Sequence, residues 1–160
     1  MRTALRNSTA ILVFLLIASC SNHAMFDVFA PIKNGWHQDS IVQFTVPVKD
    51  TSMQYFVSMK IRHNADYAYE NVYLFRTISS ASGIEYQDTV DLILADETGK
   101  WLGEGVGEVK TMQWGYGRGA LRFNNTGKYT FSLQQGMRDS VLVGIMDVGL
   151  SIEEIDEQAE

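Results

Sequence analysis

Three histidines, one cysteine and a group of carboxylates are the residues of this sequence that could support chemistry. His23, His37 and His63 share no ligand spacing, and Cys20 is the only cysteine, so the combination that holds zinc is missing. No Gly-x-Ser-x-Gly segment occurs, which is the pattern that exposes a nucleophilic serine in hydrolases. We therefore expect a protein that is not an enzyme, with no metal or other cofactor, whose histidines lie on the surface or in loops.

The carboxylates Asp88, Asp91, Asp96 and Glu97 lie close together in the sequence. On a strand, positions 88 and 91 point to opposite faces because side chains alternate with a period of two, so these two carboxylates cannot share a proton or a metal. Residues 96–99 have the composition of a turn. We expect Asp96 to bind nearby backbone amides there rather than calcium.

The N-terminal segment carries the strongest local signal. Arg2 and Arg6 are followed by an apolar run at residues 10–18, which suits a signal peptide but is too short to span a bilayer. The run ends in Ile-Ala-Ser-Cys, which looks like a bacterial lipobox. We therefore predict a lipoprotein signal peptide at residues 1–19 and a mature chain of residues 20–160. The alternative is an ordinary signal peptide followed by a chance cysteine.

Lipid on Cys20 would attach the mature chain to a membrane. Each buried methylene of an acyl chain contributes about 0.8 kcal/mol, so a multiply acylated cysteine anchors a protein without a transmembrane helix. Ser21 follows Cys20, in place of the aspartate that retains enteric lipoproteins in the inner membrane, and no acidic run of the kind associated with surface export is present. We expect an outer-membrane anchor with the protein facing the periplasm.

Composition and charge fit a small exported globule. Apolar residues make up 46% of the chain and charged residues 20%, as in ordinary folded proteins. Removing residues 1–19 takes the formal net charge from -6 to -8. Such a surface repels phosphate backbones, so we expect no nucleic-acid partner.

Apolar and polar residues alternate with a period of two in several segments, which is typical of strands with one buried face. In residues 54–62, for example, Tyr55, Val57 and Met59 share one face. The predicted strands are residues 41–48, 54–62, 71–78, 89–95, 120–123, 129–133 and 141–152, and the last should bend near Gly144 or Gly149.

Turn residues separate the predicted strands at 49–52, 64–66, 79–83, 96–99 and 124–127. Seven or eight short strands in roughly 135 residues predict an all-β fold, a two-sheet antiparallel sandwich of the jelly-roll type. The acidic segment 153–160 is expected to be frayed.

The three tryptophans suggest a ligand platform. Trp36, Trp101 and Trp114 could present exposed indole faces, on which jelly-roll carbohydrate-binding modules stack sugar rings. We favour the other interpretation, in which these aromatic side chains fill the ends of the core, because they are large hydrophobic groups first.

Three Asp-Ser/Thr-apolar triplets resemble the O-glycosylation signal of exported Bacteroidetes proteins. They would place glycans on Ser40, Thr89 and Ser140. Each triplet also lies at the start of a predicted strand, where a polar turn gives way to an apolar residue in any case.

Several segments of the mature chain, taken in order, carry a wider resemblance. They are Asn34-Gly-Trp-His-Gln-Asp39, residues 55–62, Tyr69-Glu-Asn-Val-Tyr-Leu-Phe75, Asp88-Thr-Val90, Leu94-Ala-Asp96 with Gly99-Lys-Trp-Leu-Gly103, Gly127-Lys-Tyr-Thr-Phe131, Gln135-Gly-Met-Arg138, and Val148-Gly-Leu150. Together they resemble the GldH family of gliding-motility lipoproteins of Bacteroidetes. The resemblance implies an envelope lipoprotein associated with the gliding apparatus, and it implies no catalytic residue or ligand.

Two functions of different classes follow. The first is a non-catalytic protein of the cell envelope that binds other gliding or secretion lipoproteins. The second is a periplasmic or surface carbohydrate-binding module, which depends on exposed faces of the three tryptophans.

Overall fold

The computed structural model describes residues 24–155, so the predicted signal peptide, Cys20, His23 and residues 156–160 lie outside the described part. The strands are β1 (Ala24–Pro31), β2 (Trp36–His37), β3 (Val42–Val48), β4 (Gln54–His63), β5 (Asn71–Ser80), β6 (Gly83–Ile93), β7 (Lys110–Gly115), β8 (Gly127–Gln135), β9 (Val141–Leu142) and β10 (Ile145–Ile155).

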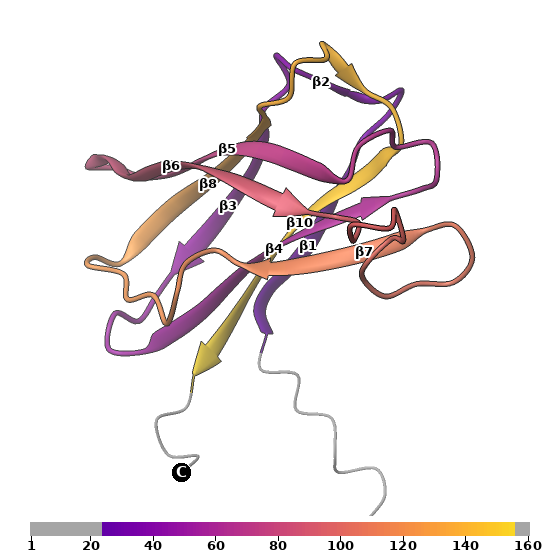
Figure 1. The fold of residues 1–160 in the computed structure, drawn as a ribbon. Coiled ribbons are helices and arrows are strands. Elements are labelled where there is room, and N and C mark those ends of the chain that lie inside the picture. Colours follow the sequence, from indigo (N-terminus) through magenta and orange to yellow (C-terminus); the bar gives the residue numbers. More distant parts are fainter. Residues whose placement is uncertain (1–23, 156–160) are drawn as a thin grey trace, which may run out of the picture.

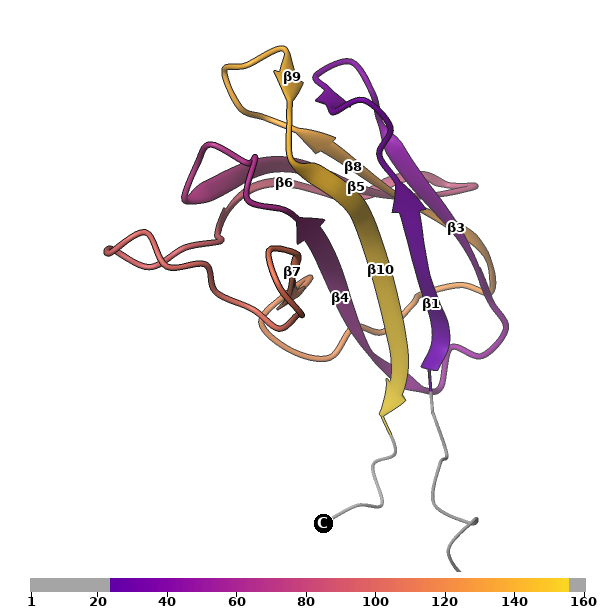
Figure 2. The same cartoon turned by 90° about the vertical axis from the view of Figure 1, so that its right-hand side faces the viewer.

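Eight of these ten strands form two four-stranded sheets that face each other (Figures 1 and 2). The strand order is β1-β10-β4-β7 in one sheet and β3-β8-β5-β6 in the other, while β2 and β9 pair separately at one end. The antiparallel pairs β1–β10, β3–β8, β4–β7 and β5–β6 are nested around the centre of the chain. This nesting is the jelly-roll arrangement, and the predicted all-β sandwich is confirmed.

The alternation in the sequence places the core between the sheets. Phe131 and Leu133 of β8 point inward from one sheet, and Val148 and Leu150 of β10 point inward from the other; all four are fully buried. Burying a side chain of this size stabilises the folded state by about 1.5–3 kcal/mol. The two apolar faces therefore hold the sheets together without a disulfide.

Most predicted strands and turns are confirmed, and the exceptions have local causes. Residues 120–123 form no strand, only a single bridge from Leu121 to Tyr55. Strands β1, β2 and β7 were not predicted, because β1 is apolar on both sides, β2 has only two residues and β7 follows a glycine-rich loop. The predicted strand 89–95 begins earlier, at Gly83, and residues 153–155 belong to β10 rather than to a frayed tail.

The predicted strand 141–152 is interrupted at Gly144, one of the two glycines expected to mark a bend. Gly144 joins β9 to β10 with φ +87°, and a Cβ atom there would overlap the backbone of Tyr67. Glycine is therefore required both for its positive φ and for the space it leaves.

We expect Gly144→Ala to lower the free energy of unfolding by about 2–4 kcal/mol, because it combines backbone strain with a clash against fixed backbone atoms. The measurement is urea unfolding at 25 °C. Gly119→Ala is the matched control, because open space surrounds Gly119, and it should change stability by less than about 0.5 kcal/mol. Equal stability of the two variants would contradict the role given to Gly144.

Candidate functional site

The sandwich is open on one side, between the edge strands β6 and β7. A groove of about 560 Å³ lies there. Its floor comes from β4 and β5, one wall from β6, and the other from β7 and the segment after it. The lining residues are Met59, Arg76, Tyr86, Asp88, Val90, Asp91, Leu92, Trp114, Gly115, Tyr116, Gly117 and Arg118.

Arg76 lies at the floor of this groove, with only 5% of its side chain exposed. Nε donates a hydrogen bond to Asp88 Oδ1 at 2.8 Å and Nη2 donates to Asp88 Oδ2, so the pair is bidentate. Nη1 donates to the carbonyl oxygen of Tyr116 at 2.7 Å, and the guanidinium lies 4.5 Å from the centre of the Tyr116 ring. One cation therefore fixes β5, β6 and the segment after β7 relative to one another.

Asp88 remains ionised beside Arg76. Burial raises the pKa of Asp88, but the hydrogen bonds from Arg76 and Tyr86, together with the charge of the guanidinium, outweigh burial, so the pKa lies below its usual value. The Tyr86 hydroxyl donates to Asp88 Oδ2 at 2.6 Å, which raises the pKa of Tyr86. The carboxylate is thus fully engaged and is poorly suited to act as a base or nucleophile.

Arg76 was not among the predicted functional residues, although its place on an apolar strand face is a signal in the sequence. Val72, Leu74, Arg76 and Ile78 share the inner face of β5, and the other three are fully apolar and buried. An arginine on the apolar face of a strand requires a buried partner. The partner is Asp88, which lies directly opposite Arg76 in the β5–β6 register.

His63 forms a second polar feature at the end of β4. It is fully buried, contrary to the prediction of a surface or loop position, and its ring centre lies 4.5 Å from that of Trp101. Nδ1 lies 3.2 Å from the carbonyl oxygen of Asn64, whereas Nε2 has no partner among the described residues. Burial, aided by the nearby charge of Lys110, lowers the pKa of His63 despite the bond to Asn64. We assign a neutral ring with its proton on Nδ1.

Among the expectations for the carboxylates, the turn at Asp96 is confirmed. Asp88 and Asp91 both line the groove but bind different partners: Asp88 is paired with Arg76, and Asp91 accepts a hydrogen bond from the Asn71 side chain at 2.7 Å. Asp96 Oδ1 accepts from the backbone amides of Thr98 and Lys100, which is the predicted turn. Within residues 24–155, no group of three or more His, Cys, Asp or Glu side chains is placed to hold a metal ion.

The tryptophan platform is wrong for Trp36, which is fully buried and donates a hydrogen bond from Nε1 to the Ser40 carbonyl oxygen at 2.9 Å. Its indole fills the end of the sandwich, as the favoured interpretation expected. Trp101 packs on His63, and Trp114 lies in the groove wall on β7; both are partly buried against the core. The three indoles therefore form no common stacking surface.

The candidate glycosylation residues Ser40, Thr89 and Ser140 are all exposed. Ser40 and Ser140 precede β3 and β9. Thr89 lies inside β6 rather than at a strand start, opposite Phe75 of β5.

We expect Asp88→Ala to lower the free energy of unfolding by about 2–4 kcal/mol, because it leaves the Arg76 guanidinium buried without its counter-ion. The double variant Arg76→Met/Asp88→Ala should lower the free energy of unfolding by less than Asp88→Ala alone, because no unpaired buried charge remains. Urea unfolding of both variants measures this difference. A double variant that is less stable than Asp88→Ala would contradict the coupling.

We expect stability to fall as the pH is lowered below about 6.5, because unfolded histidine then takes up a proton that the folded His63 resists. This residue can contribute at most about 1.4 kcal/mol per pH unit, and nothing above about pH 7.5. His63→Phe should remove that part of the pH dependence, and His37→Phe, at an exposed position, should retain it. Identical pH profiles of unfolding for these two variants would refute the assignment.

Comparisons with known proteins place this architecture in a family. The family model described as GldH lipoprotein matches residues 24–152. A gliding motility lipoprotein GldH homolog from Christiangramia forsetii is 35% identical over 98% of this chain and 99% of its own length. The gliding motility lipoprotein GldH of Flavobacterium johnsoniae is 31% identical over 91% of this chain and 94% of its own length.

Among solved structures, latent PorU from Porphyromonas gingivalis is similar with a TM-score of 0.35 and 9% identity, over 87% of this chain and 14% of that one. In the described part of the chain, no helix has the length and apolar character needed to cross a bilayer. The family match spans both sheets and the open groove between β6 and β7. The chain belongs to the GldH lipoprotein family.

Proposed function

We propose that this chain is a non-catalytic lipoprotein of the cell envelope that contributes to gliding motility by binding other envelope proteins. The observation that carries the proposal is the family match over residues 24–152, which includes almost the whole described domain. Two relatives that align with nearly the full chain are named for gliding motility. Arg76, the most buried charged side chain in residues 24–155, fixes three chain segments relative to one another rather than presenting a reactive group.

Lipid on Cys20 provides the membrane attachment in this proposal. Cys20 precedes the first residue of β1, Ala24, by four residues, so even a fully extended tether spans only about 14 Å. The domain would therefore stay close to the bilayer. Ala24 pairs with Glu153 near the end of β10, so both termini leave the sandwich at the same end.

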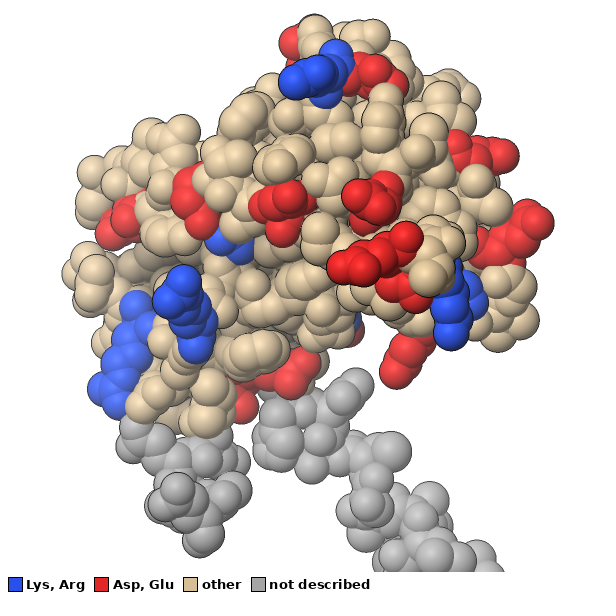
Figure 3. All heavy atoms as spheres, in the orientation of Figure 1, with Lys and Arg blue, Asp and Glu red and all other residues tan. Residues whose placement is uncertain are grey.

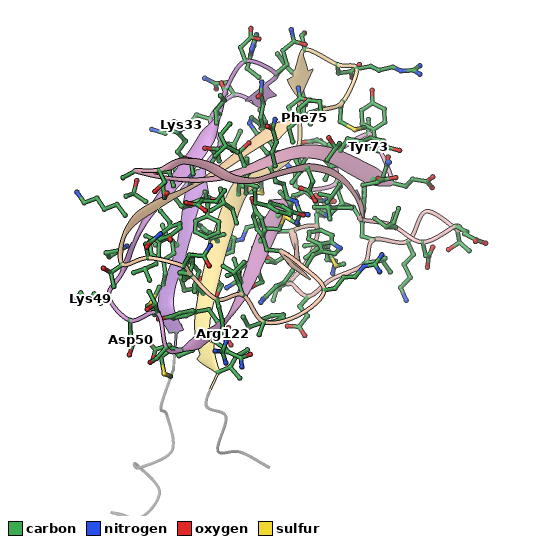
Figure 4. The ribbon with its side chains drawn as sticks, turned by 90° about the vertical axis from the view of Figure 1, so that its left-hand side faces the viewer. Lys33, Lys49, Asp50, Tyr73, Phe75 and Arg122 are labelled. Carbon is green, nitrogen blue, oxygen red and sulfur yellow. The ribbon has the colours of Figure 1, made fainter. Side chains whose placement is uncertain are left out.

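This tether gives the sandwich an orientation. Lys49, Asp50 and Arg122 lie at the end where β1 begins, and Lys33 lies toward the opposite end (Figure 4). The first end would face lipid headgroups, and the β2–β9 sheet would point away from the membrane (Figure 2). The groove between β6 and β7 runs along a side of the sandwich, so it would remain accessible to partners that are also bound to the membrane.

We place the protein in the outer membrane, facing the periplasm, because Ser21 rather than an acidic residue follows Cys20. Its partners would be other gliding or secretion lipoproteins. The net charge of -8 after removal of residues 1–19 argues against nucleic acid. The partial burial of all three tryptophans, complete for Trp36, removes the main support for carbohydrate binding as the primary function.

Glycosylation of Ser40, Thr89 and Ser140 is part of the proposal, since all three side chains are accessible. The expected result is an intact mass of the native mature protein that exceeds peptide plus lipid by sugar increments. A mass that lipid alone explains would end this part of the proposal.

We expect Cys20→Ser to abolish incorporation of radiolabelled palmitate and to release the protein from the membrane fraction. In a strain that lacks the gene, the parent sequence should restore colony spreading, movement of surface adhesins and protein secretion, and Cys20→Ser should fail to do so. Exposed Ser82→Ala, within the β5–β6 turn, is the matched control and should behave as the parent. Gene deletion without any change in these three phenotypes would refute the motility role.

A further inference from the structure

The edge strand β6 offers an unpaired backbone on the open side of the sandwich. It runs for eleven residues and pairs, within the described part of the chain, only with β5. Its other edge borders the groove toward β7, which is the outermost strand of the facing sheet (Figure 1). A free row of backbone N–H and C=O groups is complementary to another extended chain.

The two sides of the sandwich differ in how their edges are protected. The chain has two prolines, and both lie on the edge strands of the opposite side: Pro31 in β1 and Pro47 in β3. Proline has no N–H to donate, so it blocks the addition of a strand at an edge. Neither β6 nor β7 contains proline, and β6 contains no lysine or arginine.

Large apolar side chains are exposed along β6. Ile84 is 68% exposed, Tyr86 41% and Ile93 47%. The adjacent strand β5 adds Tyr73 and Phe75 on the outer face of the same sheet, where Figure 4 shows them. Such a concentration of exposed apolar groups along an unpaired edge is typical of an interaction surface.

Carboxylates accompany these apolar groups. Glu85, Asp88 and Asp91 recur along β6, and Figure 3 shows acidic residues in a row along this side of the molecule. Arg76 neutralises Asp88. Glu85 accepts a hydrogen bond from the Ser80 hydroxyl and Asp91 from the Asn71 amide, and neither donor carries a charge. The β6 strand itself is therefore negative, while Arg118 lines the groove from the segment after β7 and Arg122 lines a neighbouring pocket together with Glu85.

This charge pattern disfavours a second copy of the chain as the occupant. Glu85 lies where the β5–β6 register shifts by one residue. Two β6 strands paired antiparallel about Asp88 would still bring Glu85 of each close to Asp91 of the other, and like charges brought together across strands are destabilising. A strand that carries lysine or arginine at those positions would instead form two favourable pairs.

We infer that β6 accepts an extended, basic segment of a partner protein as an additional strand. Alternate side chains of that segment would enter the groove, where Val90, Leu92 and Trp114 provide apolar contacts and the Tyr86 hydroxyl provides a polar one. The inference deepens the proposed function, because it identifies the surface and the kind of partner through which the lipoprotein acts.

Selection from a library of short random peptides, with the mature chain as bait, tests this inference. We expect enrichment of sequences in which lysine or arginine alternates with β-branched or aromatic residues, and depletion of proline. The bait Glu85→Lys/Asp91→Lys should bind the selected basic peptides about tenfold more weakly, from the loss of two cross-strand charge pairs. Asp88 is left in place so that Arg76 keeps its partner.

Two controls keep the result interpretable. Glu104→Lys/Glu108→Lys makes the same charge change on an exposed loop and should leave affinity unchanged. Glu85→Gln/Asp91→Asn, which removes charge without reversing it, should weaken binding by an intermediate factor. If a charge-reversed bait does not unfold cooperatively like the parent, the Gln/Asn variant supplies the comparison.

Amide hydrogen exchange with the best selected peptide distinguishes strand addition from charge attraction. We expect slower exchange in β6 and unchanged exchange in β3. No enrichment of basic sequences, equal binding of a proline-interrupted peptide, or equal protection of both strands would overturn the inference. Dimerisation of the chain through β6 would also overturn it. If the gene is required for gliding while the peptides fail to bind, the proposed function stands and this inference falls.

Discussion

Burial of two apolar sheet faces against each other is the constraint on which this structure depends. Each sheet has one such face, and the fully buried residues of β8 and β10 meet between them. A sandwich built this way cannot close, so it leaves four strand edges. The chain treats the edges unequally: β1 and β3 carry its prolines, whereas β6 and β7 border a groove of about 560 Å³. That inequality gives the domain a side on which contacts can form.

The ion pair of Arg76 and Asp88 explains how the open side keeps its shape. A charged group on the inner face of a sheet disfavours closure of the two sheets over it, because closure would remove its remaining water. The carboxylate side chain is still 29% exposed, while the guanidinium is almost fully buried and bound to the backbone after β7. The pair thus joins the two sheets and leaves a polar opening between them.

The sequence predicted the features that depend on local patterns. Period-two alternation identified β4, β5 and β8, and turn composition located the turn at Asp96. The break at Gly144 is at one of the two glycines at which a bend was expected. The sequence did not predict β1, since an edge strand that is apolar on both faces has no clear period. It also did not predict the groove, because the proximity of Arg76, Asp88 and Tyr116 arises from the pairing of strands distant in sequence. The burial of Trp36 at the end of the core, in contrast, was expected from its size, and the pairing of β2 with β9 provides the site.

The central claim is that the β6 side of the sandwich is covered in the cell, and cysteine labelling tests it most directly. Cys20 is the only native cysteine, and in the proposed function its thiol carries lipid. Maleimide labelling therefore reports on a single cysteine introduced elsewhere. Gln87 on β6 and Thr45 on β3 are both exposed. The account predicts that maleimide labels Gln87→Cys at least about tenfold more slowly in native envelopes than in the purified protein, while Thr45→Cys reacts at the same rate in both. Equal labelling of Gln87→Cys in the two preparations would contradict the account.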